Sequence, residues 1–394
     1  MRLLSTILVF ALVIPGVVEA QHAILGDKVY PVSDDPIENG VVLVEDGRIL
    51  AVGRQDEITI PDNFERHEAG VVTPGFIDAR TVVGLNGIYN VSDDQDALET
   101  SSPIQPELRA FDAYNPREEL VDWVRSLGVT TVHTGHAPGA TMSGQTMVIK
   151  THGNSVGEAI MDSVHTVSMS LGPAVGMNFS SPGTRSKNAA MLRQELIRAQ
   201  EYRENGGSRD IGMEVLAQIL EGEAHAMIMA QQAPEIMTAL RIADEFDIDI
   251  YLSGAAEAYL VKEHIAEAGV PVIIHPTMVR TGGPTENASF ETAGKLHEAG
   301  IPVYFQSGYE GYVPKTRVVH YEAAIAVRNG FPREAAIESL TLGAAQLLGV
   351  DDRVGTLEAG KDADIALFED DPFEYTSRTC KVFINGEIVS DECI

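Results

Sequence analysis

The chain of 394 residues has only two cysteines, Cys380 and Cys393, and a single tryptophan. Two cysteines cannot build a cysteine-rich metal site or a disulfide scaffold, although one local bridge between them stays open. Basic residues are also scarce, since 28 Lys and Arg stand against 58 Asp and Glu and give a net charge of −30. Because phosphate binding needs a basic face, we expect no nucleic-acid partner.

Long apolar runs are missing after the first twenty residues. The run from Leu3 to Val18 is shorter than the ~20 residues that span a bilayer. Arg2 precedes this run, and Val18-Glu19-Ala20 at its end has the small residues of a signal-peptidase site. The pattern is typical of a cleaved export signal. We therefore expect residues 1–20 to be a signal peptide and the mature protein to be periplasmic or secreted, without a membrane span.

Nucleotide-binding glycine motifs are absent too, since no GxGxxG follows the first predicted strand and no GxxxxGKS/T occurs. Residues 22–73 instead show short alternating apolar runs separated by Asn39-Gly40 and Asp46-Gly47, which predicts β hairpins. After Gly75, apolar runs such as VTTVHTG alternate with helical stretches such as APEIMTALRIADEF. This alternation predicts a parallel sheet with crossover helices, and period-two patterning returns near the C-terminus around Asn385-Gly386.

Three ordered stretches carry a resemblance to a known family. VVLVEDGRILAVG, VVTPGFIDA, and SLTLGAAQLLGV followed by GTLEAGKDADIALFEDDPF resemble the amidohydrolase superfamily, specifically its exported imidazolonepropionase-like branch. The resemblance implies an α/β fold: a TIM (β/α)8 barrel, which could be distorted, with a small β-sandwich formed by the N- and C-terminal segments. The expected boundaries are 1–20 for the signal peptide, 21–73 and 351–394 for the sandwich, and 74–350 for the barrel.

The resemblance also implies a divalent metal at the C-terminal mouth of the barrel, where it activates a water for hydrolysis of non-peptide C–N bonds. The family holds this metal with histidines on strands 1, 5 and 6 and an aspartate on strand 8. The matching positions here are Arg80, Val82, Met229, Gln231, Gly254 and Gly308. Valine and glycine offer no donor atom, and a permanent cation repels a divalent ion. We therefore expect these metal positions to be degenerate and no cofactor to be bound there.

One alternative rebuilds the site from other residues. His133, His136 and His275 fall at predicted strand ends and could hold zinc or another divalent ion. Residues three apart on a strand point to opposite faces, however, so His133 and His136 converge only if the following loop folds back. The simpler interpretation is that all three are structural histidines held by hydrogen bonds.

The substrate-pocket candidates are Arg80, Lys150, Gln231 and Tyr309. Arg80 could bind a ligand carboxylate, or it could pair internally with Asp78 or Glu310. Lys150 could be a substrate-binding cation, or a lysine at a strand end that faces solvent.

Three functions stay open at this point. The preferred hypothesis is a pseudoenzyme that binds a small molecule or peptide, or that serves as the partner subunit of an active relative or as a homo-oligomer. The alternative is an active hydrolase of cyclic amides or small peptides with an atypical site. The third is a structural barrel without a ligand pocket.

The two cysteines flank the predicted C-terminal hairpin. With a regular hairpin around Asn385-Gly386, Cys380 lies diagonal to Cys393 at a Cα separation of ~7 Å, the edge of disulfide geometry. A disulfide between Cys380 and Cys393 is therefore a candidate.

Overall fold

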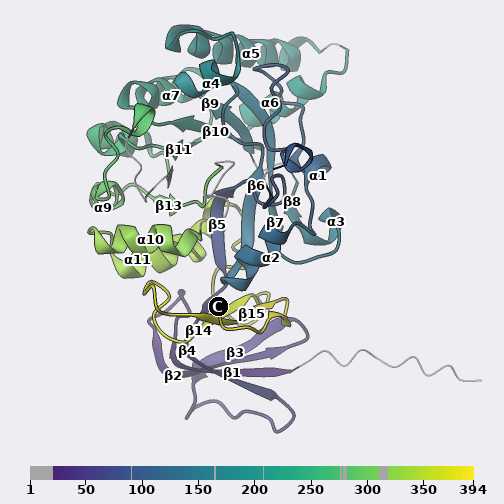
Figure 1. The fold of residues 1–394 in the computed structure, drawn as a ribbon, viewed down its shortest axis with the longest axis vertical. Coiled ribbons are helices and arrows are strands. Elements are labelled where there is room, and N and C mark those ends of the chain that lie inside the picture. The colour runs from purple at the N-terminus through teal and green to yellow at the C-terminus, as the bar shows by residue number, and fades with distance from the viewer. Residues whose placement is uncertain are drawn as a thin grey trace, which may run out of the picture.

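The computed structural model describes residues 21–89, 91–163, 166–206, 208–275, 277, 282–309 and 318–394. Its strands form two sheets, one built from the two ends of the chain and one from the segment between them (Figure 1). The expected signal peptide, residues 1–20, lies outside the described residues. No helix within these ranges combines the length and the apolar character that crossing a membrane requires.

The unit expected as a small β-sandwich is one seven-stranded sheet that combines both chain ends in the strand order β16-β15-β14-β4-β1-β2-β3, and we keep the name β-sandwich for it. Figure 1 shows its yellow C-terminal strands lying against the purple N-terminal ones. Apolar side chains such as Ile24, Val42 and Phe383 form its core because alternate strand residues face inward. The strands are β1 (His22–Val29), β2 (Ile37–Glu45), β3 (Arg48–Arg54), β4 (Glu65–Pro74), β14 (Ile365–Phe368), β15 (Thr379–Ile384) and β16 (Glu387–Ser390).

The two glycine dipeptides of the N-terminal segment behave differently. Asp46-Gly47 joins β2 to β3, as its turn chemistry predicts. Asn39-Gly40 lies inside β2, so the turn expected there is wrong. A Cβ at Gly40 would come within 2.6 Å of Val29 Cγ2, which means that the glycine serves close packing of β1 against β2.

The second sheet is a nearly closed eight-strand barrel in the order β13-β12-β11-β10-β9-β7-β6-β5. A parallel bridge between Thr81 and Gly308 connects the ends of β5 and β13 and completes the ring. The strands are β5 (Phe76–Thr81), β6 (Val129–Gly135), β7 (Met142–Lys150), β9 (Thr166–Ser170), β10 (His225–Ala230), β11 (Ile250–Gly254), β12 (Val272–Ile274) and β13 (Val303–Phe305). The TIM-barrel expectation is confirmed, including its distortion.

That distortion is the direction of β7. It pairs antiparallel with both neighbours, β6 and β9, whereas the other described barrel pairings are parallel. A short strand, β8 (Ile160–Asp162), adds to its side. Because β6 and β7 form a hairpin, no crossover helix is needed between them, and the end of β7 returns to the start of β6.

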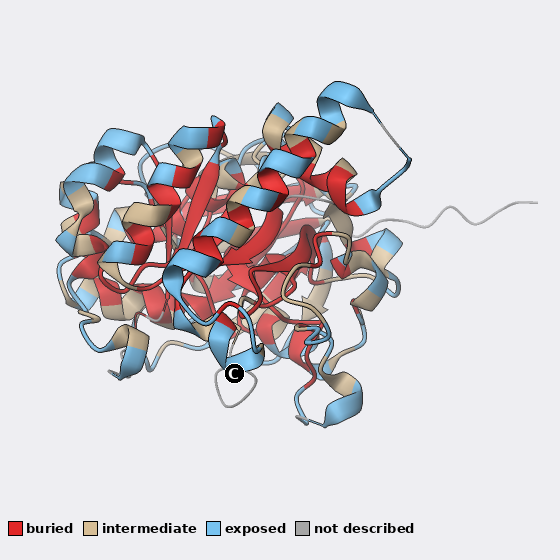
Figure 2. Cartoon of the chain, turned by 90° about the horizontal axis from the view of Figure 1, so that it is seen from above, coloured by how far each residue is buried: buried red, intermediate tan, exposed pale blue. Residues whose placement is uncertain are grey.

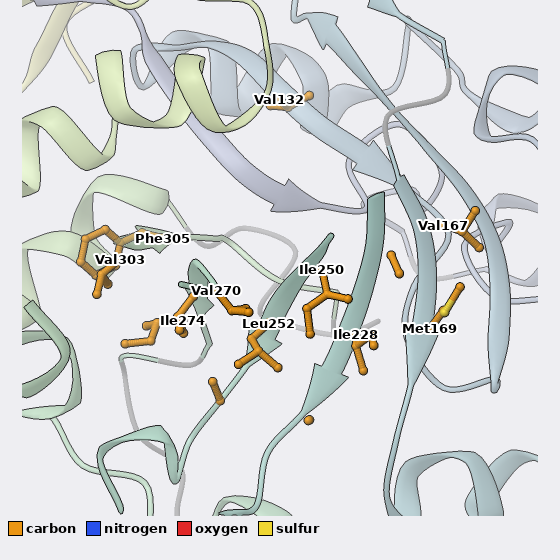
Figure 3. Packing of buried hydrophobic residues seen from close by; sticks show 14 of the residues in the cluster. Val132, Val167, Met169, Ile228, Ile250, Leu252, Val270, Ile274, Val303 and Phe305 are labelled. Carbon is orange, nitrogen blue, oxygen red and sulfur yellow. The ribbon is translucent and has the colours of Figure 1, made fainter. Parts of the chain in front are cut away.

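Helices cover the outside of the barrel, with exposed outer faces around buried strands (Figure 2). In α7 the capping box of Gln232 and Glu235 fixes the first turn, and Ile236 and Leu240 are buried. Figure 3 shows apolar strand residues such as Ile228 and Leu252 in this shared core. The helices are α1 (Ala110–Ala113), α2 (Glu119–Ser126), α3 (Val156–Ala159), α4 (Pro173–Asn178), α5 (Arg185–Asn205), α6 (Ile211–Glu221), α7 (Ala233–Phe246), α8 (Lys262–Ala268), α9 (Thr292–Glu298), α10 (Val319–Arg328), α11 (Arg333–Ser339) and α12 (Leu342–Leu347).

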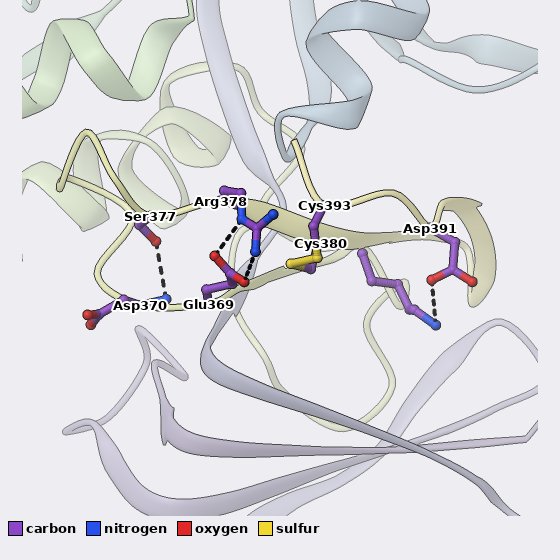
Figure 4. The surroundings of a disulfide bond; sticks show 8 residues. Glu369, Asp370, Ser377, Arg378, Cys380, Asp391 and Cys393 are labelled. Carbon is purple, nitrogen blue, oxygen red and sulfur yellow. Dashed lines mark hydrogen bonds and ion pairs between the residues drawn. A yellow bond between two sulfur atoms is a disulfide. The ribbon is translucent and has the colours of Figure 1, made fainter.

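The C-terminal hairpin carries a disulfide between Cys380 and Cys393 (Figure 4). The Cα atoms lie 3.8 Å apart, so the separation of ~7 Å expected for a regular hairpin is wrong. A register shift between Val382 and Phe383 moves the pairing by one position. Further toward the chain end, Thr379 and Ile394 exchange backbone hydrogen bonds, which places the two cysteines directly opposite each other.

Candidate ligand-binding site at the barrel mouth

A pocket of about 240 Å³ lies at the C-terminal ends of the barrel strands. This edge of a barrel is where loops from several strands converge. Its lining is mostly apolar and includes Leu171, Met177 and Met229, together with Tyr309 and the polar side chains Gln231 and Glu235. Of the four sequence-predicted pocket candidates, Gln231 and Tyr309 line this pocket.

Arg80 lies next to the mouth but does not line the pocket. Its side chain is fully buried, and its guanidinium donates hydrogen bonds to the backbone carbonyls of Thr81, Gly135 and His136. Burial lowers the pKa of Arg80 to about 10, so the group stays charged at neutral pH. The guanidinium donates to backbone carbonyls and not to the Asp78 carboxylate, so the expected internal pairing with Asp78 is wrong, and Glu310 lies outside the described residues. Binding of a ligand carboxylate by Arg80 stays a prediction.

Asp78 joins the first barrel strand to the last. Its carboxylate accepts hydrogen bonds from the Ser307 hydroxyl, from the Ser307 backbone N–H at 3.1 Å and from the Arg80 backbone N–H at 3.1 Å. Complete burial raises the pKa of Asp78 to about 6, against the lowering effect of these hydrogen bonds. Together with the Thr81–Gly308 bridge, this contact closes the barrel beside the mouth.

Gln231 ties together the loops that follow β10, β11 and β12. Its Oε1 accepts from the Ala256 N–H at 3.0 Å, and its Nε2 donates to the His275 carbonyl at 3.4 Å. The amide passes directly over Gly254, where an added Cβ would lie 2.8 Å from Gln231 Nε2. Because Gly254 also has a φ of +84°, a larger side chain there is both strained and blocked.

The three histidines of the alternative metal site do not converge. His133 makes ring contacts to the Ala79 carbonyl at 2.9 Å and the Thr146 hydroxyl at 2.6 Å. Burial lowers the pKa of His136 to about 4, and the nearby Arg80 charge adds to the effect. His275 packs against Tyr309, with ring centroids 5.3 Å apart. The expectation of a rebuilt His133–His136–His275 centre is therefore wrong within the described residues.

Lys150 lies at the opposite end of the barrel, so its assignment to the substrate pocket is wrong. Antiparallel β7 ends beside the start of β6, where Lys150 pairs in register with Thr131. Its ammonium nitrogen lies 2.7 Å from Asp362 Oδ2 and 2.9 Å from Asp364 Oδ1. The sequence pattern reveals a strand but not its direction, and the direction decides which end of the barrel receives the lysine.

Residues 250–389 match the family model described as Amidohydrolase family. The imidazolonepropionase of Solibacter usitatus is 25% identical to the chain, over 86% of each protein. A solved structure of an amidohydrolase from Thermotoga maritima is 28% identical and superposes with a TM-score of 0.85, covering 94% of this chain and 100% of that one. The chain belongs to the amidohydrolase superfamily.

Amidohydrolase tasK of Hapsidospora irregularis is a further similar protein. It is 24% identical over 93% of this chain, but the chain spans only 42% of the length of tasK. The superfamily assignment, with its imidazolonepropionase-like character, therefore rests on relatives of comparable length such as the Solibacter usitatus protein and on the Thermotoga maritima structure.

The superfamily's metal positions can now be tested against the residues that occupy them. Arg80 is saturated by backbone carbonyls, Gln231 uses both ends of its amide, and Gly254 has no side chain. Val82 is apolar and buried, Met229 lines the pocket as a thioether, and Gly308 has no side chain and forms the closing bridge. Within the described ranges the metal-capable side-chain groups lie elsewhere in the chain. This donor set does not fit a zinc-type ion at the mouth.

Sequence reasoning missed several residues of the site. Met177 lies near the end of α4 and Glu235 in the first turn of α7, and both line the pocket. Ser307 is not among the sequence-predicted residues, yet it is the partner of Asp78. The sequence signal for Glu235 is weak, since a capping box usually begins with serine or threonine and this one begins with Gln232. Nothing in the sequence pairs Asp78 with Ser307, which are 229 positions apart.

Proposed function

We propose that this superfamily member is an exported pseudoenzyme that binds a small molecule or a peptide segment at the barrel mouth and does not hydrolyse C–N bonds there. The observation that carries the proposal is the burial of Arg80, with its guanidinium held by the carbonyls of Thr81, Gly135 and His136. A fixed positive charge at a metal position opposes binding of a divalent ion. Such a protein could act alone, as a homo-oligomer or as the partner subunit of an active relative.

Hydrogen bonds between strand ends support this proposal. Arg80 connects β5 to the end of β6, Gln231 connects the ends of β10, β11 and β12, and Ser307 connects β13 to β5. A bound metal with ligands from several strands would connect the same strand ends. The mouth is thus held in shape by protein groups alone, and a pocket remains beside them.

The lining indicates the class of ligand. Apolar side chains dominate the pocket, Glu235 accepts hydrogen bonds from the backbone of Gln231 and Gln232, and Arg185 neutralises it from 3.2 Å. No unpaired charge within the described lining selects a strongly ionic ligand. A compact, largely uncharged molecule, such as a cyclic amide or a single apolar side chain of a peptide, suits this volume.

A binding and turnover assay tests the proposal. The purified protein is incubated with cyclic amides, N-acyl amino acids and dipeptides, and both binding and hydrolysis are measured. Met229→Trp fills the pocket, whereas Leu260→Trp, at an exposed side chain outside the lining, is the matched control. We expect a ligand whose affinity falls at least tenfold in Met229→Trp only, with no hydrolysis.

The second candidate is a hydrolase of cyclic amides or small peptides at an atypical site. The match to an imidazolonepropionase over 86% of both chains favours it. Turnover of any compound in the assay that disappears in Met229→Trp and persists in Leu260→Trp would establish this alternative and overturn the pseudoenzyme proposal.

A further inference from the structure

Three side chains that can bind a metal meet far from the barrel mouth, in the β-sandwich. His22 begins β1, and Glu65 begins the parallel neighbour β4 directly opposite it. His67 follows Glu65 by two positions, so that the two residues of β4 point to the same face. Register and strand alternation therefore bring His22, Glu65 and His67 together.

The ligand atoms have the spacing of a metal site. His22 Nδ1 lies 2.9 Å from His67 Nε2, Glu65 Oε1 lies 3.9 Å from His67 Nε2, and all three atoms are within 4.8 Å of one another. Zn–N bonds of ~2.0–2.1 Å in a tetrahedral site hold two nitrogens roughly 3.3 Å apart. The two nitrogens, now 2.9 Å apart with one proton between them, need to separate by only a few tenths of an ångström to accept the metal.

We propose that His22, Glu65 and His67 bind one divalent transition-metal ion of the zinc class, which links β1 to β4. Two imidazoles and one carboxylate favour zinc, cobalt, nickel or copper over calcium and magnesium. When the ion binds, the proton that lies between the two facing nitrogens moves to the outer nitrogen of its own ring, and both facing nitrogens then ligate the metal. Glu65 is 65% exposed, so the ion has access from solvent and a water can supply the fourth ligand.

The surroundings hold both rings in place. The imidazoles of His22 and His67 are buried and pack edge-on against Phe383, with ring centroids 5.1 Å and 5.3 Å away. The two nitrogens consequently face each other before any metal arrives, which limits the ordering cost of binding.

Lys381 opposes the metal. Its ammonium group lies 3.2 Å from His67 Nδ1 and 2.8 Å from Asp391 Oδ1; Asp391 is labelled in Figure 4. A metal on His67 Nε2 requires a proton on Nδ1, and that N–H cannot accept a hydrogen bond from Lys381. Metal binding thus requires Lys381 to give up its hydrogen bond to His67 and to retain only the ion pair with Asp391. Removing the charge of Lys381 should therefore raise the affinity of the site for the metal.

Zinc titration of the chelator-treated full protein tests the proposal, with isothermal calorimetry for affinity and cobalt absorption for geometry. We expect one zinc per chain with a dissociation constant in the micromolar range or below, and a tetrahedral cobalt spectrum. His67→Gln and His22→Gln should weaken binding at least 100-fold, and Glu65→Gln about tenfold. Lys381→Met should tighten it about tenfold, and this gain does not depend on the stability of the histidine variants.

Two control variants locate the ion. His264→Gln removes an exposed histidine of α8, and His275→Gln removes a histidine next to the barrel pocket. Both should bind zinc like the unmodified protein. The proposal is overturned by zinc binding that His275→Gln abolishes, by binding that survives in folded His67→Gln, or by the absence of stoichiometric binding in both the unmodified protein and Lys381→Met.

Discussion

The ammonium nitrogen of Lys150 lies 2.9 Å from Asp364 Oδ1, which connects the last residue of β7 in the barrel to the strand region of the β-sandwich. Lys150 also contacts Asp362 at 2.7 Å and the side chain of Asn385. Arg48 and Arg353 share the charge of Asp362, whereas Lys150 is the cation that faces Asp364. One buried lysine thereby fixes how the C-terminal segment of the β-sandwich attaches to the barrel.

Lys150→Met should strongly destabilise the fold without changing the pocket. Removing one partner of a buried ion pair typically costs about 3–5 kcal/mol because the remaining charge is left without compensation. Thermal and denaturant unfolding measure the loss, and Lys295→Met, which removes a partly exposed lysine paired with Glu291, should leave the stability nearly unchanged. A second change, Asp364→Asn, should recover part of the loss. Equal stability of the two lysine variants would contradict this role.

Arg80→Met should lower the free energy of unfolding by about 2–4 kcal/mol, since the buried carbonyls of Thr81, Gly135 and His136 lose their charged donor. Arg328→Met, at an exposed arginine of α10, is the control and should change stability by less than about 0.5 kcal/mol. The competing interpretation, in which Arg80 binds an anionic ligand, requires the opposite result: unchanged unfolding together with loss of that ligand.

Asp78 should contribute more to the stability of the folded protein in mild acid than at neutral pH. Burial raises the pKa of Asp78 to about 6 from 3.8, so between these values the folded state binds a proton that the unfolded state does not. The contribution of Asp78 to stability therefore falls as the pH rises from about 4 to about 6, by about 3 kcal/mol in total. Asp78→Asn removes this term but keeps the acceptor for Ser307 and Arg80.

Melting temperatures of both proteins at pH 4.5 and pH 7 provide the measurement for Asp78. The difference between the unmodified protein and Asp78→Asn should shift in favour of the unmodified protein at the lower pH. Asp93→Asn, at an exposed position, should follow the unmodified protein at both values. If the unmodified protein instead gained stability over Asp78→Asn on going to pH 7, the raised pKa would be wrong.

Sequence patterning predicts those features that local chemistry decides. Asp46-Gly47 forms its turn, Ile236 and Leu240 share the buried face of α7, and the hairpin around Asn385-Gly386 is present. Each depends on turn geometry or on helical periodicity within a few residues. The superfamily resemblance adds the barrel and the origin of the sandwich from both chain ends, which no local pattern reveals.

The candidate site was less predictable because its contacts join distant backbone groups. Arg80 binds carbonyls 55 and 56 positions away, and carbonyl acceptors carry no residue signature. Lys150 looked like a pocket cation because apolar patterning identifies β7 without its direction. The cysteine separation depended on a register shift at Val382, which the hairpin pattern does not encode.

Gly254→Ala should reveal whether Gln231 and Gly254 interlock. The φ of +84° alone costs an alanine roughly 1–2 kcal/mol. Gly269→Ala, with a φ of +65° and open space around its Cβ, measures that conformational cost by itself. Gly254→Ala should cost at least about 1 kcal/mol more, because its Cβ would lie 2.8 Å from Gln231 Nε2.

Truncating the glutamine separates this contact from backbone strain. In the Gln231→Ala background, Gly254→Ala should lose its excess cost and resemble Gly269→Ala, giving a coupling of about 1 kcal/mol or more in a double-mutant cycle of unfolding free energies. Additive effects of the two changes would mean that the Gln231 amide can move away from an alanine Cβ at position 254 at little cost in free energy. In that case Gly254 would be explained by its backbone conformation alone, and the amide would not hold the strand ends at the barrel mouth in a fixed arrangement.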